Sequence, residues 1–210
     1  MPNIVRTINE TAMENTYYIT NDEYMLIVDP GSNTEKIFRK IEELDKIPFA
    51  ILLTHTHYDH IMSVEAIREA YPGIPVYVSP KEAEWLGNPE LNLSGKNRHS
   101  DIANIIVQPA EFTFEAHKEY DLGGMKFTVV ETPGHSIGGV SFVFDDFVIT
   151  GDALFKGSIG RWDLYTGDHQ MLVDAIQREL FTLDSDIKVY PGHGVSTTIG
   201  HEKLYNPHFN

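Results

Sequence analysis

An apolar run passes directly into a histidine-rich segment in the stretch AILLTHTHYDH, residues 50–60. The run predicts a buried strand. His55 and His57, two residues apart in extended backbone, project to the same side and can offer two nitrogens to one metal ion. Asp59 and His60 follow as the chain turns toward a helix, where they can face a second position close by. Four ligand-type side chains at one strand end favour a metal site over a polar loop with incidental histidines.

Three further segments repeat one local pattern, in which an apolar strand ends in a small-residue turn and then a potential ligand. They are VVETPGHS with His135, FVITGDALF with Asp152 and KVYPGHG with His193. Each ligand lies beside glycine, where the backbone can approach an ion closely. One such turn alone is more often an ordinary turn. Together with the first segment, however, these sites supply seven ligands, which is what two adjacent metal ions sharing a water need.

Composition narrows the function further. The formal net charge of −15, with 16 lysines and arginines in 210 residues, repels polyanions, so we expect no nucleic-acid partner. The absence of cysteine excludes disulfides and thiolate ligands and leaves histidine and carboxylate to bind metals. No apolar stretch reaches about 18 residues, so no membrane partner is expected. The N-terminus carries no recognisable secretion signal, which makes a cytoplasmic location the default expectation, and the sequence does not indicate the oligomeric state.

The order of the predicted elements favours an α/β fold. Apolar strand-like runs alternate with amphipathic helix-like segments in two roughly similar halves, the pattern of a layered α/β protein. We find no Gly/Ser-rich or Pro-rich linker and no short repeat. The sequence therefore predicts a single domain over residues 1–210.

Three local patterns carry more specific expectations. Residues 34–47 predict a helix whose inward face is formed by four apolar positions, Ile37, Ile41, Leu44 and Ile47. Ser79-Pro80-Lys81-Glu82 predicts a helix start, with Ser79 at the cap and the Glu82 side chain reaching back to it. Residues 88–110 are rich in Asn, Ser, Gly and Pro and predict a long connection or a lid.

The ligand segments, taken in order, resemble the signature of the metallo-β-lactamase superfamily: His-x-His-x-Asp-His followed by separate His, Asp and His positions. The match spans residues 16–194. The resemblance implies a four-layer αββα sandwich that binds two divalent metal ions per chain, zinc in the first place and iron or manganese as alternatives. It assigns one ion to His55, His57 and His135, the other to Asp59, His60 and His193, and a bridging position to Asp152.

Within this superfamily, GDALFKGSIGRWDL (151–164) and PGHGVSTTIGHEKLYNP (191–207) resemble the short glyoxalase II-like hydrolases. The resemblance implies hydrolysis of a small-molecule thioester, as in hydroxyacylglutathione hydrolases, by a hydroxide that bridges two metals. Asp59 is then expected to orient that hydroxide and accept its proton, with Asp152 as the second catalytic carboxylate. Only 17 residues follow His193, fewer than the helical domain with which glyoxalase II grips glutathione. The thiol carrier is therefore left open.

Two cations lie near these ligands in the sequence and suggest an anionic substrate. The resemblance places Arg161 where a basic residue contacts the glycine carboxylate of glutathione, and Lys156 lies five residues before it. A surface arginine paired with Asp163 is the alternative interpretation of Arg161. The remaining histidines match no ligand pattern and are interpreted as ordinary polar residues: His99, His117, His169, His201 and His208.

Other functions remain open at this point. Persulfide dioxygenases, which use one iron and molecular oxygen, resemble the chain in the same motifs, and a lactonase is a further alternative. A purely structural or metal-sensing site is disfavoured, because structural sites are closed by four protein ligands whereas this set leaves room for water.

Overall fold

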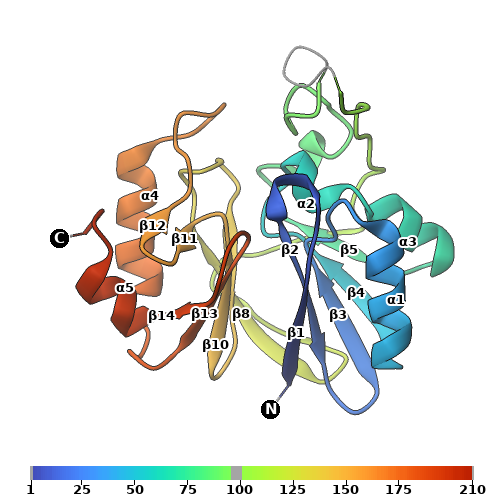
Figure 1. The fold of residues 1–210 in the computed structure, drawn as a ribbon, viewed down its shortest axis with the longest axis horizontal. Helices are drawn as coiled ribbons and strands as arrows, with labels where there is room; N and C mark the ends of the chain where they lie inside the picture. Colours follow the sequence, from blue (N-terminus) through green and yellow to red (C-terminus); the bar gives the residue numbers. More distant parts are fainter. Residues whose placement is uncertain (1, 96–100, 210) are drawn as a thin grey trace. The chain divides into compact units, whose positions relative to one another are not determined.

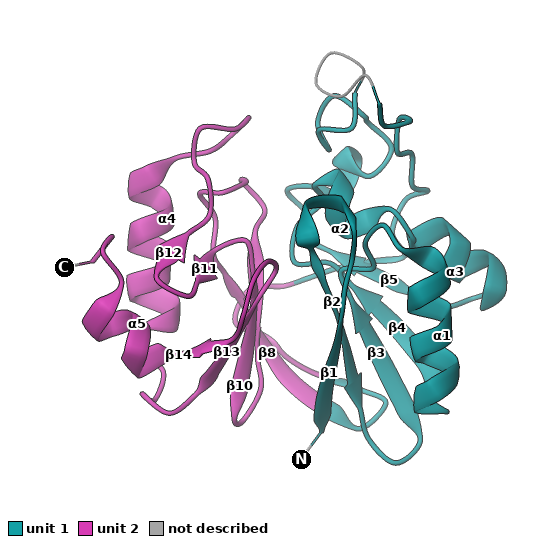
Figure 2. Cartoon of the chain, in the orientation of Figure 1, with its two compact units in different colours: residues 1–114, 121–125 teal, residues 115–120, 126–210 magenta. Residues whose placement is uncertain are grey.

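The computed structural model describes residues 2–95 and 101–209, so His99 lies outside the described residues. The chain divides into two compact units: residues 1–114 with 121–125, and residues 115–120 with 126–210 (Figure 2). Each unit is built around one six-stranded sheet with its helices. This division does not test the prediction of a single domain over residues 1–210, which stays a prediction.

The sheet of the first unit has the order β1-β2-β3-β4-β5-β6 (Figure 1). Its strands are β1 (Asn3–Ile8), β2 (Asn15–Thr20), β3 (Tyr24–Val28), β4 (Ile47–Leu52), β5 (Val76–Val78) and β6 (Phe112–Thr113). β1, β2 and β3 pair antiparallel, whereas β3 to β6 pair parallel. The carboxyl ends of β3, β4 and β5 therefore lie at one edge of the sheet.

The helices of this unit are α1 (Thr34–Leu44), α2 (Tyr58–Ile61) and α3 (Val64–Ala70), with short 3-10 turns at Thr11–Met13 and Ala83–Trp85. Ile37 and Ile41 of α1 are buried in the core against the sheet, as predicted. The prediction for Ile47 is wrong: Asp45 ends the helix in a left-handed conformation, and Ile47 begins β4 with 56% of its surface exposed.

The second sheet has the order β14-β13-β10-β9-β8-β7. Its strands are β7 (Glu119–Leu122), β8 (Met125–Glu131), β9 (Val140–Val143), β10 (Phe147–Gly151), β13 (Lys188–Pro191) and β14 (Thr197–Thr198). β10 and β13 are parallel, so their carboxyl ends also lie at one edge, while β8, β9 and β10 are antiparallel. A separate hairpin, β11 (Leu154–Phe155) and β12 (Ser158–Ile159), follows β10.

Two helices cover this sheet. α4 (His169–Ala175) continues into a π-helical turn, Ile176–Leu180, and α5 (Ile199–Tyr205) lies near the end of the chain. Asp168 caps α4 by accepting a hydrogen bond from the amide of Met171 at 2.8 Å. The side chains of these helices that are buried in the core of the second unit include Leu172, Ile176 and Ile199.

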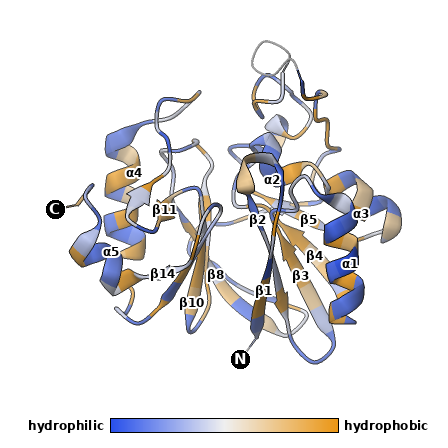
Figure 3. Cartoon of the chain, viewed as in Figure 1, coloured by the Kyte–Doolittle hydropathy of each residue, from blue (hydrophilic) through white to orange (hydrophobic). Residues whose placement is uncertain are grey.

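The hydropathy of the residues differs between the buried strands and the surface of the helices. In Figure 3 the strands β3 and β4 are largely in hydrophobic colours, whereas α1 shows hydrophilic residues on one side. Residues 88–95 and 101–110 form turns and irregular chain, as predicted for a long connection. Among the helices of residues 2–95 and 101–209, none is both long enough and apolar enough to span a bilayer.

Candidate metal centre

The first unit presents four predicted ligands: two lie in the loop after β4 and two lie in α2. His55, His57, Asp59 and His60 are all buried. The ring centroid of His55 lies 4.7 Å from that of His57 and 4.2 Å from that of His60. Nε2 of His60 lies 3.7 Å from a carboxylate oxygen of Asp59. The structure thus gathers these four side chains within one unit, and their role as metal ligands stays a prediction.

Asp29, at the end of β3, forms hydrogen bonds with both ends of the ligand segment, residues 54–60. Its carboxylate accepts hydrogen bonds from the amide of Thr54 at 2.8 Å and from the Thr54 hydroxyl at 2.6 Å. It also lies 3.0 Å from Nδ1 of His60. Because a carboxylate only accepts, Nδ1 of His60 carries the proton and Nε2 keeps its lone pair for a metal, the usual arrangement behind a ligating histidine.

The sequence analysis did not single out Asp29 as a site residue. Ligand atoms of Asp29, His55 and His60 lie within 4.8 Å of one another. The signal that could have found Asp29 is its place directly after a strand that neighbours β4, because parallel neighbours end at the same edge.

The second unit gathers the other three predicted ligands. One carboxylate oxygen of Asp152, after β10, lies 3.4 Å from Nε2 of His135 and 3.3 Å from Nε2 of His193, after β13. Nδ1 of His135 donates to the main-chain carbonyl of Arg161 at 2.8 Å, because a carbonyl only accepts. Nε2 of His135 is therefore the atom available to a metal. A carboxylate oxygen between two imidazoles suits a ligand shared by two ions.

A buried carboxyl, Glu14, lies behind the ligands of the first unit. It is fully buried, and one of its oxygens accepts a hydrogen bond from the side-chain amide of Asn9. Burial raises the pKa of Glu14 well above its usual range, while the hydrogen bond from Asn9 acts in the opposite direction. A side chain at Gly31 would overlap the Glu14 carboxyl, so only glycine fits this turn.

We expect Glu14→Gln to flatten the pH dependence of stability. A raised pKa in the folded state means that the contribution of Glu14 is fully present below about pH 4.5 and is lost as pH rises toward the folded pKa. The neutral amide lacks this loss, so the free energy of unfolding of the variant should gain on that of the wild type as pH rises above about 4.5. Urea unfolding of the metal-free proteins measures it, with exposed Glu35→Gln as the control. Parallel pH profiles of wild type and Glu14→Gln would contradict the assignment.

The two predicted substrate cations are both at the surface. Lys156 is exposed beside the turn of the β11–β12 hairpin. Arg161 donates two hydrogen bonds to Asp163, at 3.0 and 2.9 Å, and 68% of its side chain is exposed. This pairing lowers the pKa of the Asp163 carboxyl. The ion pair of the alternative interpretation is therefore present, while the backbone of Arg161 supports His135.

The donor chemistry of these residues fits divalent metals. Imidazole nitrogens suit zinc and iron, and carboxylate oxygens also suit manganese. The ring orientations of His60 and His135 are each fixed through Nδ1, as expected of ligands that bind through Nε2. The set contains no thiolate, because the chain contains no cysteine.

Comparison with known proteins identifies the family. The family model described as the metallo-beta-lactamase superfamily matches residues 11–193. The chain belongs to this superfamily. A crystal structure of the BLEG-1 B3 metallo-beta-lactamase superimposes with a TM-score of 0.93 at 36% identity, covering 99% of this chain and 100% of that one. The predicted metallo-β-lactamase fold is thus confirmed.

Other members of the superfamily are also similar over nearly their full length. A probable metallo-hydrolase of Streptococcus pyogenes serotype M6 is 56% identical over 209 residues, which cover 99% of this chain and 90% of the relative. The hydroxyacylglutathione hydrolase GloC of Haemophilus influenzae is 33% identical, over 94% of this chain and 93% of the relative. TTHA1623, crystallised in a di-iron-bound form, has a TM-score of 0.84 at 33% identity and covers 97% and 98% of the two chains. Family and donor set identify the chain as a metallo-hydrolase.

Proposed function

We propose that this metallo-hydrolase cleaves a small anionic thioester, as hydroxyacylglutathione hydrolases do, with two divalent metal ions held by its His and Asp side chains. The observation that carries the two-metal centre is the position of the Asp152 carboxylate between Nε2 of His135 and Nε2 of His193. Similarity to a hydroxyacylglutathione hydrolase over nearly the whole chain supports the thioester.

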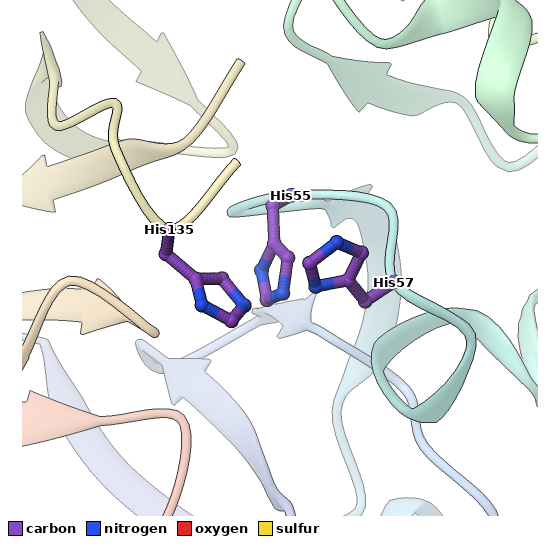
Figure 4. Close-up of side chains that lie close together, drawn as sticks. All are labelled: His55, His57 and His135. Atoms are coloured by element: carbon purple, nitrogen blue, oxygen red, sulfur yellow. The ribbon is translucent and has the colours of Figure 1, made fainter. Parts of the chain in front are cut away.

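The proposed ligands divide into two sets. The first ion is assigned to His55, His57 and His135, three buried histidines whose side chains are drawn in Figure 4. The second ion is assigned to Asp59, His60 and His193, with Asp152 shared by both. Two ions held by these residues would supply hydroxide near neutral pH, because a divalent ion lowers the pKa of a bound water toward about 7. A relative crystallised in a di-iron-bound form supports two ions, and zinc is our proposal for this chain.

The protein's own side chains then have separate tasks. The Asp59 carboxylate orients the attacking hydroxide and accepts its proton. Asp29 keeps Nδ1 of His60 protonated, and the Arg161 carbonyl does the same for His135. The leaving thiolate is a weak base, so the reaction requires no strong general acid. Lys156 and Arg161 are proposed to attract the carboxylate of the substrate.

A substrate panel tests this function. Acyl-glutathione, acyl-coenzyme A and acyl-homoserine lactone are offered to protein loaded with zinc, manganese or iron, and free thiol or ring opening is measured. We expect thiol release from at least one thioester and a lower rate with the lactone. Stoichiometric oxygen consumption with glutathione persulfide would instead establish a dioxygenase, and ring opening alone would establish a lactonase.

We expect Arg161→Ala to raise KM for the best thioester about tenfold with little change in kcat, because one charge-assisted contact in the ground state is lost. The matched control is Arg178→Ala, since Arg178 is also an exposed arginine that pairs with the next acidic side chain, Glu179, at 2.7 Å. Steady-state kinetics of the two variants measure the difference. An unchanged KM in Arg161→Ala would contradict a role for Arg161 in substrate binding and would leave only its surface ion pair with Asp163.

A further inference from the structure

Glu82 has a different role from the helix cap that its sequence context predicts. The turn after β5 forms the short 3-10 helix Ala83–Trp85, and its N-cap is Glu82, not Ser79. The Glu82 oxygen Oε2 accepts a hydrogen bond from the amide of Thr56 at 2.8 Å and another from the Thr56 hydroxyl at 3.0 Å. Glu82 and Thr56 are both fully buried.

The hydrogen bonds between Thr56 and Glu82 matter because of the residues on either side of Thr56. Thr56 lies between His55 and His57, two ligands assigned to the same ion. Asp29 forms hydrogen bonds with Thr54 and His60, at the two ends of the segment. Glu82 therefore supports the middle of the segment, where a rotation of one peptide would turn both imidazoles.

Two residues that follow Glu82 in the chain, Trp85 and Asn92, contact the residues that follow Thr56. The indole of Trp85 stacks on the ring of His57, with centroids 6.5 Å apart and an interplanar angle of 22°. The main-chain carbonyl of Asn92 accepts a hydrogen bond from the amide of Tyr58 at 2.8 Å. Residues 82–92 thus contact three successive residues of the ligand segment.

We propose that Glu82 is a positioning residue for the metal ion held by His55 and His57. By fixing the amide and the hydroxyl of Thr56, it holds the two flanking histidines in a ligating arrangement before the ion binds, so that binding requires less ordering of the chain. Glu82 is thus proposed to act on the ion through Thr56. This inference rests on the two-metal centre of the proposed function.

Zinc titration against a chromogenic chelator tests the proposal on metal-free protein, without any measurement of activity. In Glu82→Ala, one of the two ions is expected to bind about 10–100-fold more weakly, the usual loss when an outer partner of a metal ligand is removed, while the other changes little. Glu82→Gln keeps an oxygen that can accept both bonds from Thr56 and should recover most of the lost affinity. Exposed Glu84→Ala, on the same turn and with the same loss of charge, should bind as the wild type does.

Thr56→Val provides a second variant for the case in which Glu82→Ala does not fold. It keeps the amide donor and removes the hydroxyl, so a smaller loss for the same ion is expected. Wild-type affinity for both ions in Glu82→Ala, or in Thr56→Val where only that variant folds, would overturn the proposal. Equal losses in Glu82→Ala and Glu82→Gln would also overturn it. Failure of the wild type to bind two zinc ions would contradict the proposed function instead.

Discussion

Asp152→Ala is expected to abolish tight binding of the second metal ion and to lower turnover by at least about 10³-fold, the scale seen when a member of a jointly acting catalytic set is removed. The physical reason is the single carboxylate oxygen that lies 3.4 Å from Nε2 of His135 and 3.3 Å from Nε2 of His193. Alanine leaves the two imidazoles without the anion that two nearby cations require.

Metal content by inductively coupled plasma mass spectrometry and kcat/KM for the best thioester measure this effect. Asp145→Ala is the matched control, because Asp145 is an exposed aspartate in the turn that leads into β10. Full metal content and full rate in Asp152→Ala would show that Asp152 does not bridge two ions.

Asp29→Asn is expected to weaken the ion assigned to His60 by up to about 100-fold and to lower turnover to a similar extent. The amide oxygen of asparagine can still accept from the amide of Thr54, but its NH₂ group would face Nδ1 of His60. Nδ1 must then accept, so the proton moves to Nε2, the atom a metal needs. The variant thus changes the tautomer of a ligand while changing its shape very little.

Asp45→Asn is the matched control for Asp29→Asn. Both aspartates have a positive φ, +50° at Asp29 and +49° at Asp45, a conformation that asparagine also adopts readily, but Asp45 is exposed at the end of α1. The protonation of His60 in the metal-free protein is followed by ¹⁵N NMR of the imidazole. A His60 that stays protonated at Nδ1 in Asp29→Asn, with wild-type metal affinity, contradicts this account.

The sequence predicted the residues whose local pattern is unusual. His55, His57, Asp59 and His60 stand out because apolar strand ends rarely carry so many ligand types, and the structure places them together as expected. His135, Asp152 and His193 share the strand-turn-ligand pattern and meet in the second unit, because parallel β10 and β13 end at one edge. The joining of these two sets on shared ions stays a prediction.

The supporting residues could not be predicted in the same way, because each has an adequate local explanation. Asp29 stands in an Asp-Pro-Gly turn, and Glu82 stands where a helix cap is expected. Their bonds reach residues 25, 31 and 26 positions away, which only the pairing of β3, β4 and β5 brings near. Ile47 shows the opposite error, in which a local pattern was misleading. Its spacing continues the helical period of α1, but the helix ends at Asp45 and Ile47 begins β4.

Crystals of the zinc-loaded protein, with anomalous data collected above and below the zinc edge, reveal how many ions bind and which residues hold them. We expect two anomalous peaks per chain: one bound by His55, His57 and His135, the other by Asp59, His60 and His193, and Asp152 in contact with both. A single peak, no peak, or peaks bound by other residues would contradict it.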